Sequence, residues 1–117
     1  MNVPQAIVQV SVREFAQRAA EVSADALQLI DVREPQEAAI ASLPGFTLVP
    51  LSQSEQWVET LPAQLNAHQE TYVLCHHGMR SAQMCQWLMA QGFTNVKNIQ
   101  GGIDAYAIDV DRSVPRY

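Results

Sequence analysis

Cysteine is scarce in this sequence: its 117 residues include only Cys75 and Cys85. Two cysteines cannot build the disulfide framework of a small secreted protein, and a reducing compartment would keep both as thiols. The reactivity of each thiol therefore has to be argued from its own surroundings.

Basic residues are also few. Seven Lys and Arg stand against twelve Asp and Glu, which gives a formal net charge of −5 and a pI near 5.0. This balance argues against nucleic-acid binding, because surfaces with that role gather Lys and Arg. Local binding of a small anion is still compatible with it.

Long apolar runs are missing as well. No stretch approaches the ~20 residues that a membrane span needs, and the N-terminus has no basic start followed by a long apolar segment. We expect a cytoplasmic protein with no membrane contact. The length and the 48% hydrophobic content match a single domain over residues 1–117, which we expect to be a monomer.

Segments typical of strands alternate with segments typical of helices. Ser11 and Glu14 have the spacing of a capping box at the start of the first helix. The strand segments are 6–10, 27–32, 47–51, 71–75 and 96–99. The helical segments are 11–20, 33–41, 52–68 with an interruption near Pro62, 80–91 and 101–109. This alternation predicts an α/β domain with a mostly parallel sheet.

The stretch CHHGMRS connects a predicted central strand to the clearest helix. Cys75 ends the strand and Arg80 begins the helix, and open α/β sheets bind ligands at such junctions. Backbone N–H groups of residues 76–80 and the positive end of the helix dipole would together hold an anion. Gly78 suits the tight loop, and Arg80 adds a permanent charge with a planar fork of donors.

The same field favours a thiolate at Cys75, since cysteines at helix N-termini are often ionised near neutral pH. A cysteine at the end of a buried strand can also be a small core side chain, but Gly78 and Arg80 at these spacings favour a nucleophile. Cys85 shares one helical face with Leu88 and Met89 and is assigned to the core. A redox role for Cys85 is the less favoured alternative.

His76 and His77 raise the question of a metal site. Adjacent residues rarely converge on one ion, and no second pair of ligands occurs at zinc spacing. We therefore expect neither a metal nor a cofactor. The two histidines are predicted to line the mouth of the pocket as hydrogen-bond donors or proton-handling groups, or else to be solvated loop residues.

Three motifs resemble those of the rhodanese-like sulfurtransferases. LIDVREPQE is similar to the DVRE motif of that family, CHHGMRS to its C-x-x-G-x-R active-site loop, and NIQGGIDAY to the GG motif before its last helix. They occur in the family's order, and the resemblance covers most of the chain. Two departures concern structure more than chemistry: ASLPGF replaces the frequent GHIPGA, and Tyr106 replaces a Trp.

The resemblance implies a rhodanese-like, doubly wound α/β fold with a five-stranded parallel sheet flanked by helices. It implies that Cys75 accepts a sulfane sulfur from a small anion such as thiosulfate and holds it as a persulfide. The acceptor would be cyanide in an assay, and a thiol or a sulfur-carrier protein in the cell. The residues expected to bind the substrate are His76, His77, Gly78, Met79 and Arg80.

Asp31 and Arg33 match the DVR positions of the same resemblance. We expect them to support the active-site loop through a salt bridge or hydrogen bonds. The alternative is that they are surface charges of little energetic weight.

Two other classes of function stay open. Phosphatases and arsenate reductases on this fold also place a cysteine and an arginine around an anion, but they carry five residues between the two, and this chain has four. A non-enzymatic interaction module is the other class. It occurs when such domains lose the cysteine, whereas Cys75 and Arg80 are both present here.

Overall fold

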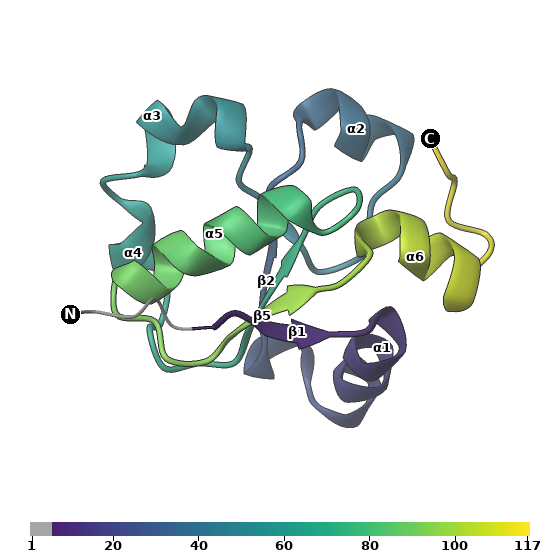
Figure 1. Ribbon diagram of the computed structural model, residues 1–117, viewed down its shortest axis with the longest axis horizontal. Coiled ribbons are helices and arrows are strands. Elements are labelled where there is room, and N and C mark those ends of the chain that lie inside the picture. Colours follow the sequence, from purple (N-terminus) through teal and green to yellow (C-terminus); the bar gives the residue numbers. More distant parts are fainter. Residues whose placement is uncertain (1–5) are drawn as a thin grey trace.

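The computed structural model describes residues 6–117, and within that range five strands form one sheet (Figure 1). The strand order is β1-β5-β4-β2-β3, and every neighbouring pair is parallel. The strands are β1 (Val8–Val10), β2 (Gln28–Asp31), β3 (Thr47–Leu48), β4 (Thr71–Leu74) and β5 (Val96–Ile99). The predicted fold class is confirmed. The expectation about the N-terminus rests partly on residues 1–5, which lie outside the described residues.

Helices and short turns connect the strands. The first helix begins with the predicted capping box, because the Glu14 N–H donates to Ser11 Oγ and the Ser11 N–H donates to Glu14 Oε1, both at 3.0 Å. The helices are α1 (Val12–Glu21), α2 (Pro35–Ile40), α3 (Ser54–Trp57), α4 (Leu61–Gln64), α5 (Met79–Ala90) and α6 (Gly102–Asp109). Two 3₁₀ turns, η1 (Ala24–Ala26) and η2 (Leu51–Gln53), complete the list.

The sheet is covered on both faces, as its apolar strands predict. Val73 and Cys75 belong to the core that includes buried residues of α5, whereas Tyr72 and Leu74 belong to the core that includes buried residues of α1 and α6. Figure 1 shows α5 and α1 on opposite sides of the strands. Because β4 lies in the middle of the sheet, a residue that follows it directly is placed deep inside the molecule.

The segment between β3 and β4 differs from the prediction. Instead of one long helix with a break near Pro62, it contains η2, α3 and α4, and residues 58–60 form a turn between α3 and α4. Pro62 lies in the first turn of α4, where its missing N–H costs nothing. The strand predicted over residues 47–51 is only Thr47–Leu48, and Pro50 instead accepts a hydrogen bond from Trp57 Nε1 at 2.8 Å.

The start of α6 holds the backbone that follows β4. The Ile103 N–H donates to the Cys75 carbonyl at 2.9 Å, and the Asp104 N–H donates to the His76 carbonyl at 3.2 Å. Gly102 makes this approach possible, since its φ is +63° and a Cβ atom there would overlap with both carbonyl groups. Glycine is therefore required at the second position of the GG motif, because any side chain there would overlap with the two carbonyl groups.

We predict that Gly102→Ala destabilises the fold by more than the roughly 1–2 kcal/mol expected for a left-handed residue alone, because the added methyl group also meets backbone. Gly92→Ala is the matched control: Gly92 has a φ of +96°, but a Cβ there meets no atom within 4 Å. Urea unfolding of both variants provides the measurement. Equal losses in the free energy of unfolding would contradict the steric argument.

Candidate active site

The sulfur of Cys75 lies at the junction of β4 and α5. The residue directly follows β4 and is 1% exposed. Its Sγ accepts a hydrogen bond from the Gly78 N–H at 3.0 Å and lies 3.3 Å from Ser81 Oγ. Because α5 begins at Met79 and runs for 12 residues, the sulfur also lies near the positive end of a helix dipole. The dipole and the N–H both favour negative charge on it.

The loop over this sulfur turns at Gly78, which has a φ of 100° and is the N-cap of α5. Its N–H points to Cys75 Sγ, and its carbonyl accepts a hydrogen bond from Asn98 Nδ2 at 3.0 Å. The sequence predicts convergence of the amides of residues 76–80, and the structure bonds the Gly78 amide to the sulfur. Anion binding by the other loop amides stays a prediction.

Arg80 is held by a carboxylate that the sequence analysis does not single out. Its Nη1 and Nη2 donate to Oε1 and Oε2 of Glu37 on α2, at 2.6 and 3.0 Å. This hydrogen bonding lowers the pKa of Glu37 to about 2 and raises the pKa of Arg80, so the pair is charged at neutral pH. Glu37 occupies the end of the guanidinium, which leaves Nε and the outer N–H groups for an anion.

Asp31 and Arg33 form a buried ion pair with each other. Arg33 is 0% exposed and Asp31 is 3% exposed. Arg33 Nε donates to both carboxylate oxygens at 3.0 and 3.1 Å, and Nη2 donates to Oδ2 at 2.7 Å. The alternative that they are surface charges is therefore wrong. Within residues 6–117, neither side chain is hydrogen-bonded to the loop. The connection runs instead through Tyr117, whose hydroxyl oxygen accepts from Arg33 Nη1 at 3.0 Å.

Tyr117 belongs to a segment for which the sequence pattern gives no interpretation. Its hydroxyl group donates to Glu37 Oε2 at 2.8 Å. Its ring stacks on His76, with centroids 4.0 Å apart and planes at 8°. One tyrosine therefore connects Arg33, Glu37 and the loop.

The two histidines of the loop have different environments. His76 lies under Tyr117, and its Nε2 is buried without a hydrogen-bond partner among residues 6–117. Burial and, to a lesser degree, His77 lower the pKa of His76. The His77 side chain is 61% exposed, and its Nδ1 lies 4.0 Å from Asp104 Oδ2. His77 and the exposed Met79 thus face solvent, whereas His76 is partly buried against the Tyr117 ring.

Cys85 lies in the hydrophobic core on α5, as its helical face predicts. Burial, and to a lesser degree Cys75, raises the pKa of Cys85 to about 12. This thiol is therefore protonated at neutral pH. Within residues 6–117, no group of three or more His, Cys, Asp or Glu side chains is placed to hold a metal ion.

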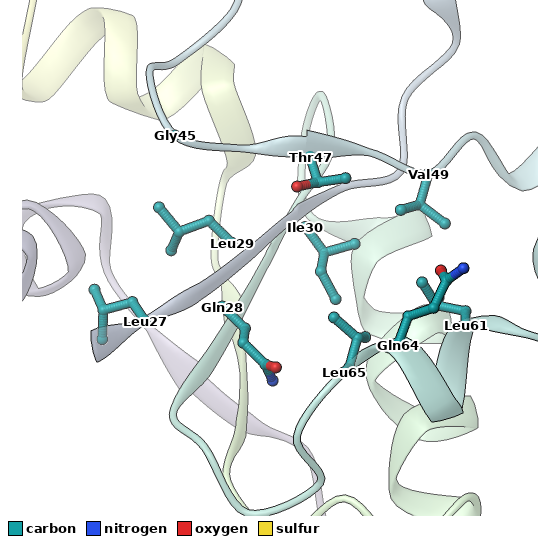
Figure 2. A pocket seen from close by; sticks show the side chains of 10 residues that line it. All are labelled: Leu27, Gln28, Leu29, Ile30, Gly45, Thr47, Val49, Leu61, Gln64 and Leu65. Atoms are coloured by element: carbon teal, nitrogen blue, oxygen red, sulfur yellow. The ribbon is translucent and has the colours of Figure 1, made fainter. Parts of the chain in front are cut away.

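A separate pocket of about 350 Å³ lies among β2, β3 and α4 (Figure 2). None of its lining residues is titratable, and none belongs to the loop after β4. The pocket therefore offers no titratable group for acid–base chemistry. Its lining residues are Leu27, Gln28, Leu29, Ile30, Gly45, Thr47, Val49, Leu61, Gln64 and Leu65.

Comparison with known proteins assigns a family to this fold and site. The family described as "Rhodanese-like domain" matches residues 11–109. The chain belongs to the rhodanese-like domain family.

Individual relatives agree with this assignment. The Arabidopsis thaliana "Rhodanese-like/PpiC domain-containing protein 12, chloroplastic" is 53% identical over 80% of this chain, which spans 31% of that protein. A "Sulfurtransferase" of Allochromatium vinosum is 32% identical over 68% of this chain and 70% of its own length. The human single domain sulfurtransferase TSTD1 has the same fold, with a TM-score of 0.73 and 24% identity over 92% of this chain and 98% of its own.

The chain spans less than half of the length of several curated relatives. The activities of those whole proteins are therefore not assigned to it. Over residues 6–117, the structure has no helix long and apolar enough to cross a membrane. The cytoplasmic location stays a prediction, and the Arabidopsis relative is named as chloroplastic.

We predict that iodoacetamide at limiting dose labels Cys75 well ahead of Cys85. Cys75 receives an N–H donor at the start of a helix, whereas the pKa of Cys85 is raised to about 12, and alkylation follows the thiolate fraction and access. Peptide mass mapping identifies the labelled residue. Label on Cys85 at an equal or faster rate would contradict the assignment, and Cys75→Ser serves as the control for background labelling.

Proposed function

We propose that this chain is a sulfurtransferase that carries a sulfane sulfur as a persulfide on Cys75. The observation that carries the proposal is the position of Cys75 Sγ, directly after the central strand and bonded to the Gly78 N–H where α5 begins. Membership of the rhodanese-like family supports it, and so do relatives that are named as sulfurtransferases. The donor is a small sulfur-containing anion, for which thiosulfate is the test compound.

In the first step the Cys75 thiolate attacks the outer sulfur of thiosulfate. A new S–S bond forms, the bond between the two thiosulfate sulfurs breaks, and sulfite leaves with the bonding electron pair. The Gly78 N–H beside the sulfur and the N–H groups of Arg80 that Glu37 leaves free stabilise the negative charge. The product is a persulfide on Cys75.

In the second step an acceptor attacks the terminal sulfur of the persulfide. The S–S bond breaks, and Cys75 leaves as a thiolate. The same groups that favour negative charge on Cys75 make it a good leaving group, since a stabilised thiolate departs faster. The acceptor is cyanide in an assay, and a thiol or a sulfur-carrier protein in the cell. Neither step uses a metal or a cofactor.

We predict that incubation with thiosulfate adds the mass of one sulfur atom to Cys75. Intact-mass analysis followed by peptide mapping checks this, and added cyanide should remove the extra mass. Cys75→Ser is expected to fold, because a hydroxyl group fits the same space, but it should gain no sulfur, since serine is not ionised and cannot form a persulfide.

Three outcomes would overturn the proposed function. The first is an added sulfur that maps to Cys85, and the second is normal sulfur transfer by Cys75→Ser. The third is hydrolysis of an aryl phosphate that depends on Cys75, which would favour phosphoryl chemistry. The phosphatase assay is run on the same preparation as the sulfur-transfer assay. If that preparation transfers sulfur, an absence of phosphatase activity cannot be due to misfolded protein.

Arg80→Lys should keep the fold but lose about 2–4 kcal/mol of transition-state stabilisation with thiosulfate, by analogy with removal of one oxyanion donor. An ammonium group cannot hold both Glu37 oxygens and still offer a planar fork to the donor. The measurement is kcat/KM for thiosulfate. Arg116→Lys is the matched control, because Arg116 also pairs with a carboxylate, that of Asp104, but on the surface. Wild-type kcat/KM in Arg80→Lys would remove Arg80 from the mechanism.

A further inference from the structure

Ser81 is a buried hydroxyl group between two other buried polar groups. Its Oγ lies 3.3 Å from Cys75 Sγ and is hydrogen-bonded to Oδ1 of Asn98 on β5. The exposed fractions of Ser81, Cys75 and Asn98 are 0%, 1% and 2%. Buried polar groups rely on one another for hydrogen bonds. The direction of each bond therefore determines whether Ser81 offers a hydrogen or only lone pairs to Cys75 Sγ.

The other partners of Asn98 fix the direction of the bond to Ser81. Asn98 Nδ2 lies 3.0 Å from the Gly78 carbonyl oxygen and 2.9 Å from Gln9 Oε1. A main-chain carbonyl can only accept a hydrogen bond, so the amide nitrogen must face Gly78 and the amide oxygen must face Ser81. The Ser81 hydroxyl group is therefore the donor to Asn98.

A serine hydroxyl group has one hydrogen. While that hydrogen points to Asn98, Ser81 presents only lone pairs to Cys75 Sγ. A protonated thiol can donate its hydrogen to these lone pairs. A thiolate has no hydrogen to donate. Its negative charge is therefore repelled by the lone pairs of Ser81 Oγ, or it competes with Asn98 for the hydroxyl hydrogen.

We infer that Ser81 and Asn98 form a positioning pair that opposes ionisation of Cys75. Asn98 keeps the Ser81 hydrogen away from the sulfur, against the Gly78 N–H and the dipole of α5, which favour the thiolate. The pair thereby sets how readily the nucleophile is generated. Its bearing on catalysis rests on the proposed role of Cys75, but its effect on the thiol does not.

Other charged or titratable groups also act on this region, and the test has to leave them in place. Arg80 and Cys85 interact with Cys75 from α5, and Glu37 and Asp104 act on the loop from α2 and α6. His76 is part of the loop itself. The variants below change none of these five residues.

The test is the rate of iodoacetamide labelling of Cys75 as a function of pH, followed by peptide mass analysis. In Ser81→Ala the midpoint of the rate–pH curve should shift to lower pH by about half to one unit, the effect of one net hydrogen bond. The rate at the high-pH plateau should fall by no more than about threefold, because a thiolate with a lower pKa is a weaker nucleophile. If Ser81 instead donates to the sulfur, the same substitution shifts the midpoint to higher pH. That sign, or an unshifted midpoint, would overturn the inference.

Asn98→Leu has a similar shape but no acceptor, so it releases the Ser81 hydrogen toward the sulfur. We expect a shift to lower pH that is larger than in Ser81→Ala and that falls back to the Ser81→Ala value in the double variant. Gln9→Ala is the control, because it removes a partner of Asn98 Nδ2 and leaves Oδ1 in place. A shift in Gln9→Ala equal to that in Ser81→Ala would contradict the assigned direction.

The labelling experiment separates this inference from the proposed function. Alkylation needs no sulfur donor, so the midpoints can be measured even if the protein transfers no sulfur. Conversely, if the protein forms the Cys75 persulfide but Ser81→Ala shows no shift of the midpoint, the proposed function is supported and the positioning pair is rejected. If Asn98→Leu fails to fold, the Ser81→Ala result decides alone.

Discussion

The contact on which the site depends is the pair of hydrogen bonds that the start of α6 donates to the carbonyls of Cys75 and His76. In a planar trans peptide the C=O and the N–H point in opposite directions. Fixing two carbonyls toward α6 therefore directs the following amides away from it and determines how the loop can turn at Gly78. The absence of a side chain at Gly102 is the condition for this geometry.

A series of charged and polar contacts also supports the same loop. The buried Asp31–Arg33 pair holds the Tyr117 hydroxyl group, which in turn donates to Glu37, and Glu37 binds Arg80. Each charged group in this series of contacts lies beside an opposite charge or a hydrogen-bond partner. Buried ions need such partners, because an unpaired buried charge destabilises the fold. The arginine of the loop is thus oriented by residues other than the hydrogen-bond partners of Cys75 Sγ, which are Gly78 and Ser81.

The parts of the fold that local patterns specify were predictable from the sequence. The capping box at Ser11, the apolar strands and the junction from Cys75 to Arg80 are of this kind. The site residues that the sequence analysis misses depend on distant contacts: Glu37 meets a partner 43 residues away, and Tyr117 meets one 80 residues away. The local pattern around Glu37 concerns only the start of α2, where the Glu34 N–H donates to the Glu37 carboxylate, and it does not point to Arg80. The buried state of Arg33 had no local signal, because burial of a charge depends on its partners.

The wide sequence separation of these contacts has a consequence for folding. The groups that hold the loop after Cys75 come from β2, α2, β5, the start of α6 and Tyr117, so this support is complete only when the last segments have joined the sheet. Contacts between residues far apart in sequence form slowly, because a long loop must close before they stabilise the chain. A partly folded chain therefore holds the Cys75 thiol beside Gly78 and Ser81 but without Asn98 and the distant contacts that fix the loop. The chemical character of this cysteine becomes a marker of the finished fold.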